Sequence, residues 1–150
     1  MESQLENNLT VIDTLNGLIQ INNDRIQGSE KAVETITDAK TKRLFELVIE
    51  QSAGFRQQLI SEIRRVGGQA EWNDTTDKGK IHEFWLNIKS AFKSESVDSG
   101  IERAQFSEET ARKAYDDALL SDVNFPTETR ELLISQRREM KIFGEASLKT

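Results

Sequence analysis

The chain contains no cysteine, one proline and one histidine among its 150 residues. The absence of cysteine excludes disulfide bonds, thiolate metal sites and cysteine nucleophiles. It is typical of proteins of the reducing cytoplasm, and we expect a cytoplasmic location. A single proline and eight glycines leave few points at which a helix must end, which favours long helices over many short strands.

The sequence also lacks long apolar segments and an excess of positive charge. No apolar run approaches the roughly 20 residues that span a bilayer, and the start, MESQLENNLT, lacks the basic region and apolar core of a signal peptide. The net charge of −6 opposes approach to phosphate backbones and anionic lipids, so we expect neither nucleic acid nor a membrane as a partner. With 36% hydrophobic residues, the chain is expected to fold as a single domain over residues 1–150.

Four long segments carry apolar residues at steps of three and four, which is the spacing of one face of a helix. The segments are residues 4–36, residues 40–66, the stretch from residue 98 or 99 to a turn at 121, and residues 126–143. Thr37 or Asp38 can cap the second helix, and Gly67-Gly68 is the left-handed stop that a helix end prefers. Pro126 suits the first turn of the last helix.

The connections between these helices predict how they are arranged. The first and second helices are joined by a short turn, as are the third and fourth, so each pair should form an antiparallel hairpin. Residues 69–97 form a much longer connection, with a short amphipathic helix over 81–92. Four long helices with one long crossover connection predict an all-α, ferritin-like four-helix bundle with a short extra helix.

Each long helix interrupts its apolar stripe with polar residues. They are Asn23 and Glu30 in the first helix, Ser52 in the second, Glu108 in the third, and Gln136 and Glu139 in the fourth. Carboxylates that converge in a core repel one another, and each costs several kcal/mol to bury unpaired. A divalent cation between them would cancel the repulsion. One hypothesis is therefore a metal site, for iron or manganese, formed by Glu30, Glu108 and Glu139.

A hydrogen-bonded polar layer explains the same pattern without any ligand. In this interpretation Asn23, Ser52 and Gln136 belong to a layer that fixes the register of the helices. Metal sites in bundles usually include histidine, and the one histidine, His82, lies on the short connecting helix. We therefore prefer the layer without a cofactor. Tyr115, on the stripe of the third helix, is expected in the core with its hydroxyl bonded to a polar partner.

Several blocks of sequence resemble a known family. They are Ile21-Asn22-Asn23-Asp24, Glu30-Lys31-Ala32 and Glu62-Ile63-Arg64-Arg65-Val66-Gly67-Gly68, then His82-Glu83-Phe84-Trp85 with Lys89, then Glu108-Glu109, Ala114-Tyr115 and Ala118-Leu119, and finally Gln136, Glu139 and Lys141. In these blocks the chain is similar to an uncharacterised bacterial family of ferritin-like four-helix-bundle proteins, known as a domain of unknown function. Gly144 stands where that family often has a histidine, so the last helix lacks a nitrogen ligand for a metal.

The resemblance implies a ferritin-like bundle, no established activity and an association with stress. We therefore predict a non-enzymatic structural or interaction protein whose di-metal centre is vestigial or incomplete. The alternative is a carboxylate-bridged iron or manganese protein, or an oxidase. Dimers are the commonest assembly of soluble proteins, so a homodimer is expected, and the protein partner, if there is one, is not identified by the sequence.

Overall fold

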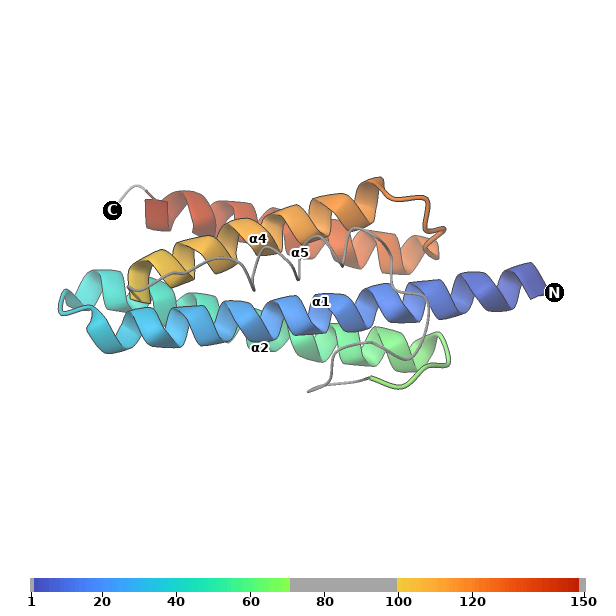
Figure 1. The fold of residues 1–150 in the computed structure, drawn as a ribbon, viewed down its shortest axis with the longest axis horizontal. Coiled ribbons are helices and arrows are strands. Elements are labelled where there is room, and N and C mark those ends of the chain that lie inside the picture. Colours follow the sequence, from blue (N-terminus) through green and yellow to red (C-terminus); the bar gives the residue numbers. More distant parts are fainter. Residues whose placement is uncertain (1, 71–99, 149–150) are drawn as a thin grey trace.

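A computed structural model describes the backbone of residues 2–70 and 100–148 and the side chains of residues 5–70 and 104–140. Its described helices are α1 (Glu2–Thr35), α2 (Ala39–Arg65), α4 (Gly100–Leu120) and α5 (Thr127–Leu148), which pack together lengthwise (Figure 1). The prediction of an all-α protein with four long helices is confirmed. The short helix expected over residues 81–92, with His82, lies outside the described residues. Within the described ranges, no helix has both the length and the apolar character needed to cross a membrane.

The turn between α1 and α2 and the end of α2 follow the predicted signals. Asp38 is the N-cap of α2, and its carboxylate accepts a hydrogen bond of 2.8 Å from the backbone N–H of Thr41. After α2, Gly67 adopts a φ of 90°, a backbone conformation that residues other than glycine rarely adopt. The N–H of Gly68 bonds to the carbonyl of Ile63 at 2.9 Å, which completes a Schellman motif.

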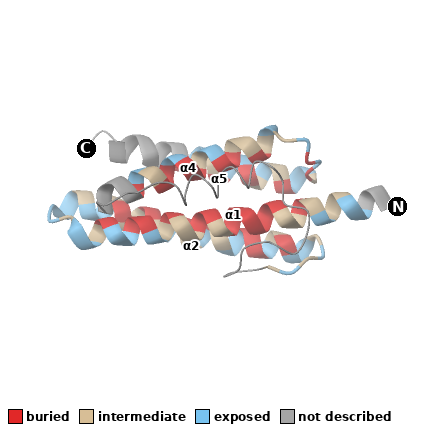
Figure 2. Ribbon diagram, in the orientation of Figure 1, coloured by how far each residue is buried: buried red, intermediate tan, exposed pale blue. Residues whose placement is uncertain are grey.

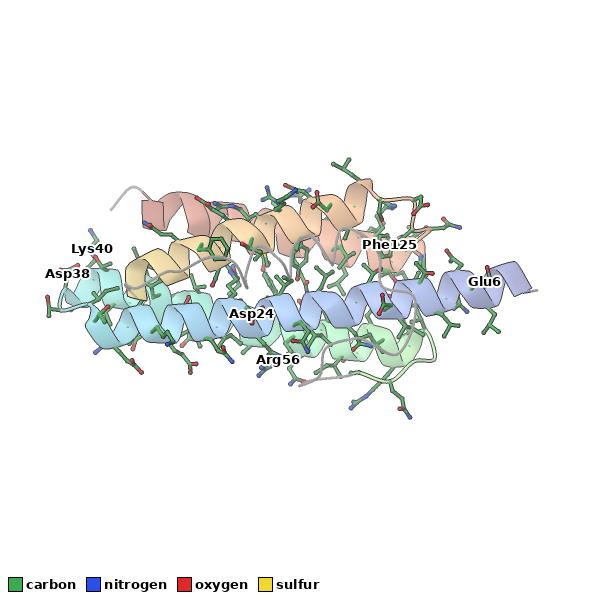
Figure 3. All side chains as sticks on the ribbon, in the orientation of Figure 1. Glu6, Asp24, Asp38, Lys40, Arg56 and Phe125 are labelled. Atoms are coloured by element: carbon green, nitrogen blue, oxygen red, sulfur yellow. The ribbon has the colours of Figure 1, made fainter. Side chains whose placement is uncertain are left out.

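The helix directions require one long crossover. Asn7, near the start of α1, donates to the carbonyl of Asn124 in the α4–α5 turn, and Ile12 of α1 lies against Gly68 after the end of α2. Both α2 and α4 therefore run toward the end of the bundle where α1 begins, so they are parallel. Phe125 marks this end and Asp38 the opposite one (Figure 3). The end of α2 and the start of α4 consequently lie at opposite ends of the bundle.

The core occupies the centre of the four helices (Figure 2). The stripes predicted for α2 and α4 are buried as expected. Their described core residues are Phe45, Val48, Ser52, Phe55, Leu59 and Ile63 on α2, and Ala104, Glu108, Ala111, Tyr115 and Ala118 on α4. The buried stripe of α2 is narrow, whereas α4 also buries Ser107, Thr110 and Ala114 and so turns a broader face toward the interior.

The stripe that the three- and four-residue spacing predicts along α1 is only partly correct. It consists of Leu5, Leu9, Ile12, Leu15, Ile19, Asn23, Ile26, Glu30 and Val33. Leu5 and Leu9 are 61% and 58% exposed, because the start of α1 extends beyond the ends of the other helices (Figure 1). Farther along, α1 packs against both α2 and α4, and it buries a second stripe that the prediction did not separate from the first. This second stripe contains Val11, Leu15, Leu18, Asn22, Arg25, Ser29 and Ala32.

Candidate functional site

A charged side chain lies at the centre of the bundle. Arg25 of α1 has no exposed surface and is the largest of the fully buried side chains. Its Nε donates to Oε2 of Glu108 at 2.6 Å, and its Nη2 donates to Oε1 of Glu108 at 2.9 Å. Its Nη1 donates to the hydroxyl of Ser52 at 2.9 Å. One guanidinium thus joins α1, α2 and α4.

The two buried charges of this layer compensate each other. The side chain of Glu108 is 10% exposed, so both partners are largely removed from water. Desolvating either ion alone costs several kcal/mol, and only a paired geometry with additional hydrogen bonds offsets the loss. The two parallel N–H···O bonds form the bidentate arrangement that suits guanidinium and carboxylate best. The layer therefore requires both residues together.

A second, uncharged layer lies next to the first. Asn22 of α1 donates through Nδ2 to the Tyr115 hydroxyl at 3.0 Å, and that hydroxyl donates to Oε1 of Gln136 at 2.6 Å. Gln136 in turn donates through Nε2 to the carbonyl of Phe55 at 3.3 Å and to Oε1 of Gln58 at 3.0 Å. Burial raises the pKa of Tyr115 above its ordinary value of 10, so the hydroxyl stays protonated and remains a donor. The prediction that Tyr115 is a core residue with a bonded hydroxyl is confirmed.

The two layers form one polar centre to which all four described long helices contribute. Asn22 and Arg25 are three residues apart on α1, and Glu108 and Tyr115 are seven apart on α4. Both spacings place the paired residues on one face of their helix, one or two turns apart. We call this set of Asn22, Arg25, Ser52, Glu108, Tyr115 and Gln136 the polar centre.

A small cavity adjoins the polar centre at Glu108. Its volume is about 10 Å³, which is room for roughly one water molecule. Residues of α1, α2 and α4 line it: Ser29, Phe45, Val48, Ala104, Gln105, Glu108, Glu109 and Arg112.

The carboxylates proposed as metal ligands are not brought together. Glu30 and Glu139 are exposed on the surfaces of α1 and α5, whereas Glu108 is buried and bound to Arg25. The three therefore do not meet inside the bundle, in contrast to the expectation from the sequence. Among residues 2–70 and 100–148, as far as their side chains are described, no group of three histidine, aspartate or glutamate side chains is placed to hold a metal ion.

The residues proposed for a polar layer have different positions. Ser52 and Gln136 are buried within the polar centre. Asn23 is not: it is half-buried at the edge of the α1–α2 interface, where its Oδ1 accepts a hydrogen bond of 2.7 Å from Nη1 of Arg56. Arg56 lies on α2 close to the turn of α1 that carries Asp24 (Figure 3). The buried amide of α1 is the preceding residue, Asn22.

The core positions of Arg25 and Asn22 were not predicted from the sequence. A signal was present, because Val11, Leu18 and Ala32 share a spacing of seven with Arg25. Such a repeat marks a continuous helix seam. An arginine in the seam indicates a buried cation, which in turn requires a buried carboxylate on a neighbouring helix.

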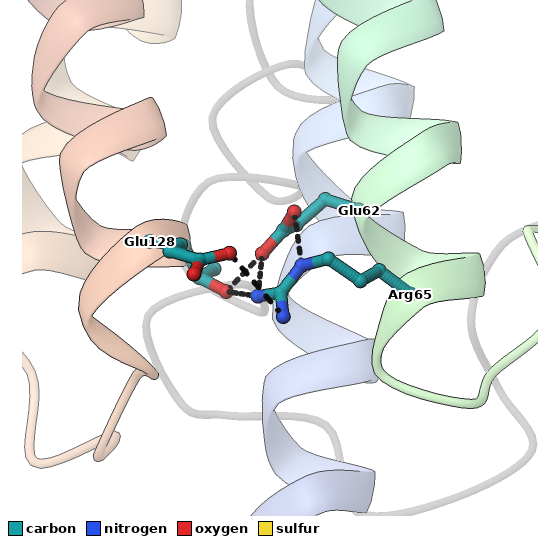
Figure 4. Close-up of polar contacts among 4 residues, drawn as sticks. Glu62, Arg65 and Glu128 are labelled. Atoms are coloured by element: carbon teal, nitrogen blue, oxygen red, sulfur yellow. Dashed lines mark hydrogen bonds and ion pairs between the residues drawn. The ribbon is translucent and has the colours of Figure 1, made fainter.

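A separate polar cluster joins the end of α2 to the start of α5 (Figure 4). Arg65 binds Glu62 through Nε and Nη2, at 3.0 and 2.5 Å, and Thr129 of α5 donates to the same carboxylate. Glu128 lies 3.5 Å from Nη1 of Arg65. The hydrogen bond from Arg65, together with that from Thr129, holds the pKa of Glu62 below its ordinary value.

Most of the chain matches a known protein family. Residues 10–121 match the model of a family described as a domain of unknown function, DUF2383. No curated protein matches the chain. The match takes in most of α1, all of α2 and all of α4, and it ends before α5 begins. Since it covers well over half of the sequence, the chain belongs to the DUF2383 family, which is defined by a domain of unknown function.

Proposed function

We propose that this DUF2383 protein is a non-enzymatic structural or interaction protein with a ferritin-like bundle, and that its polar centre serves the fold. One observation carries the proposal: both oxygens of Glu108 are bound by Arg25. The polar centre thus completes its charge balance with an arginine, in the place where a metal-binding bundle would use a cation.

The energetics of the ion pair oppose metal binding at Glu108. A metal ion would have to displace Arg25 from the carboxylate, and the guanidinium would remain buried without a counter-ion. The incoming cation would also lie next to that positive charge. A carboxylate-bridged iron or manganese site would further need Glu30 and Glu139 to leave the surface and turn inward. Neither change is favourable in this packing.

The decisive experiment measures metal content. The purified protein is loaded anaerobically with ferrous iron or with manganese, desalted, and assayed for metal per chain. We expect a metal content far below one per chain, because the described residues form no group placed to hold a metal ion. About one or two metals per chain, lost in Glu108→Gln while helicity is retained, would establish the metal-protein alternative. Glu131→Gln, which changes an exposed carboxylate outside the proposed set of ligands, is the matched control.

The second experiment concerns assembly. We propose that the protein forms a homodimer, as most soluble oligomers do, and that its role, including any association with stress, depends on its surface. Sedimentation velocity of the wild type and of Arg25→Met/Glu108→Leu tests this. A dimer in both proteins supports a surface role separate from the polar centre. A monomeric wild type contradicts the homodimer, and a dimer lost only in the double variant would tie assembly to the polar centre.

A further inference from the structure

Helix α5 buries an unusually polar face. Between residues 127 and 140 its buried side chains are Thr129, Leu133, Gln136 and Met140, so two of the four are polar. In α2 the corresponding face buries Phe45, Val48, Phe55, Leu59, Ile60 and Ile63, with Ser52 as its one polar member. The described part of α5 therefore removes far less apolar surface from water than α2 does.

Beyond the apolar contacts of Leu133 and Met140, α5 is held by polar contacts that water can replace. Gln136 bonds to Tyr115 and to α2, and Thr129 bonds to Glu62. Arg137 forms two bonds, of 2.8 and 3.1 Å, with Asp116 on α4. When such groups separate, each regains a hydrogen bond to water, so the net loss per bond is small.

The other three helices are held together differently. The buried ion pair of Arg25 and Glu108, with Ser52, links α1, α2 and α4 and leaves α5 out. The interfaces of α1 with α2 and α4 are also much more extensive than those of α5 with its neighbours. The buried contacts thus set the described part of α5 apart from the rest of the bundle.

We propose that α5 is a detachable helix, which opens from the α1–α2–α4 unit as one body while that unit stays folded. Cooperative local opening of this kind is expected where an element has few buried apolar contacts. The open state exposes Leu133 and Met140 on α5, and it uncovers the side of the polar centre at Tyr115. The inference does not depend on the function proposed above.

Native-state hydrogen exchange at increasing denaturant tests the proposal on the intact chain. We expect the amides of residues 127–140 to exchange through one shared opening reaction. This opening should be at least about tenfold more frequent than that of residues 11–22, and its free energy should depend less on denaturant concentration. If both segments exchange with the same protection and the same denaturant dependence, α5 opens only by global unfolding and the proposal fails.

Two hydroxyl deletions test the proposed contacts. Thr129→Val removes the bond from α5 to Glu62 and should speed exchange in residues 127–140 by roughly two- to tenfold, leaving residues 11–22 unchanged. Thr14→Val is the matched control, because Thr14 is also fully buried but bonds within α1, to the carbonyl of Thr10. An equal effect of both variants on α5, or no effect of Thr129→Val, would contradict the role given to this contact.

The absence of cysteine allows an independent measurement. Met140→Cys on α5 and Ala111→Cys on α4 each place one thiol at a position that is fully buried when the bundle is closed. Under conditions where closing is faster than labelling, the thiol at 140 should be labelled at least about tenfold faster than the thiol at 111. The comparison is made after correcting for the global stability of each variant. Equal corrected rates would refute a separate opening of α5.

Discussion

The sharpest prediction concerns the buried ion pair. In Glu108→Leu the carboxylate is gone, and the guanidinium of Arg25, which has no exposed surface, loses two of its three hydrogen bonds. Breaking a buried pair from one side typically costs about 3–5 kcal/mol. Because the free energy of unfolding of a domain is only about 5–15 kcal/mol, this single change should remove roughly a fifth of it or more.

Replacing both partners should restore most of the loss. In Arg25→Met/Glu108→Leu no charge remains in the layer, and the new side chains are apolar and of comparable length. Exchanges of this kind are often neutral or stabilising by about 1–4 kcal/mol. The hydroxyl of Ser52 then loses the hydrogen bond of 2.9 Å from Arg25, which lowers the free energy of unfolding by about 1 kcal/mol. The double variant should therefore lie within about 2 kcal/mol of the wild type.

Urea denaturation followed by circular dichroism at 222 nm measures these differences. The midpoint should fall in Glu108→Leu and recover in the double variant, with the slope unchanged in both. In a thermal scan the single variant should lose roughly 6–20 °C. Glu108→Gln, which keeps one carbonyl acceptor for Arg25, should lie between the two. Two results would contradict this prediction. One is a loss of unfolding free energy of less than about 1 kcal/mol in Glu108→Leu. The other is a loss in the double variant equal to the sum of the losses in Arg25→Met and Glu108→Leu.

Three further predictions concern the helix end, the cluster at α5 and the surface carboxylates. Gly67→Ala should lower the free energy of unfolding by about 1 kcal/mol, because a φ of 90° strains any residue with a Cβ atom. An unchanged midpoint in denaturant unfolding would contradict a role for the left-handed helix stop. The hydrogen bond from Arg65 lowers the pKa of Glu62 below its ordinary value of 4.5 in the folded state, so its contribution is present above that value and lost as the pH falls through the lowered pKa. The stability gap between wild type and Glu62→Gln should thus narrow on acidification below about 4.5, and a gap that is constant with pH would contradict this. Glu30→Ala and Glu139→Ala should each change the unfolding free energy by no more than about 0.5 kcal/mol, since both side chains are exposed, and a larger loss would indicate a buried role.

The sequence predicted the helices well because the signals for helix ends are local. Asp38 caps α2 through a bond to a residue three positions away, and Gly67 ends it through its own φ. The narrow stripe of α2 was also predictable, since that helix turns a single face inward. These features depend on spacing within one segment, and a single sequence contains that information directly.

The face of α1 could not be predicted in the same way. Two stripes with the same spacing run along it, offset by one residue. One contains Ile12, Ile19, Asn23, Ile26 and Glu30 and lies toward α2 or at its edge, and the other contains Val11, Leu18, Asn22, Arg25 and Ala32 and reaches the polar centre. Which of the two is central depends on how α2 and α4 straddle α1, and that is a property of the assembled bundle.

The burial of Arg25 gives the polar centre a role in selecting this arrangement. If α1 were rotated so that Asn23 and Glu30 faced inward, Glu30 would be buried near Glu108, and Arg25 would turn away from its counter-ion. The repulsion of two carboxylates would then add to the desolvation of both. The pairing of Arg25 with Glu108 opposes that rotation. On this argument the ion pair contributes little net stability relative to an apolar pair, and it acts mainly by excluding the alternative packing. The Arg25→Met/Glu108→Leu variant should therefore be about as stable as the wild type but less uniquely folded, with broader amide resonances along α1.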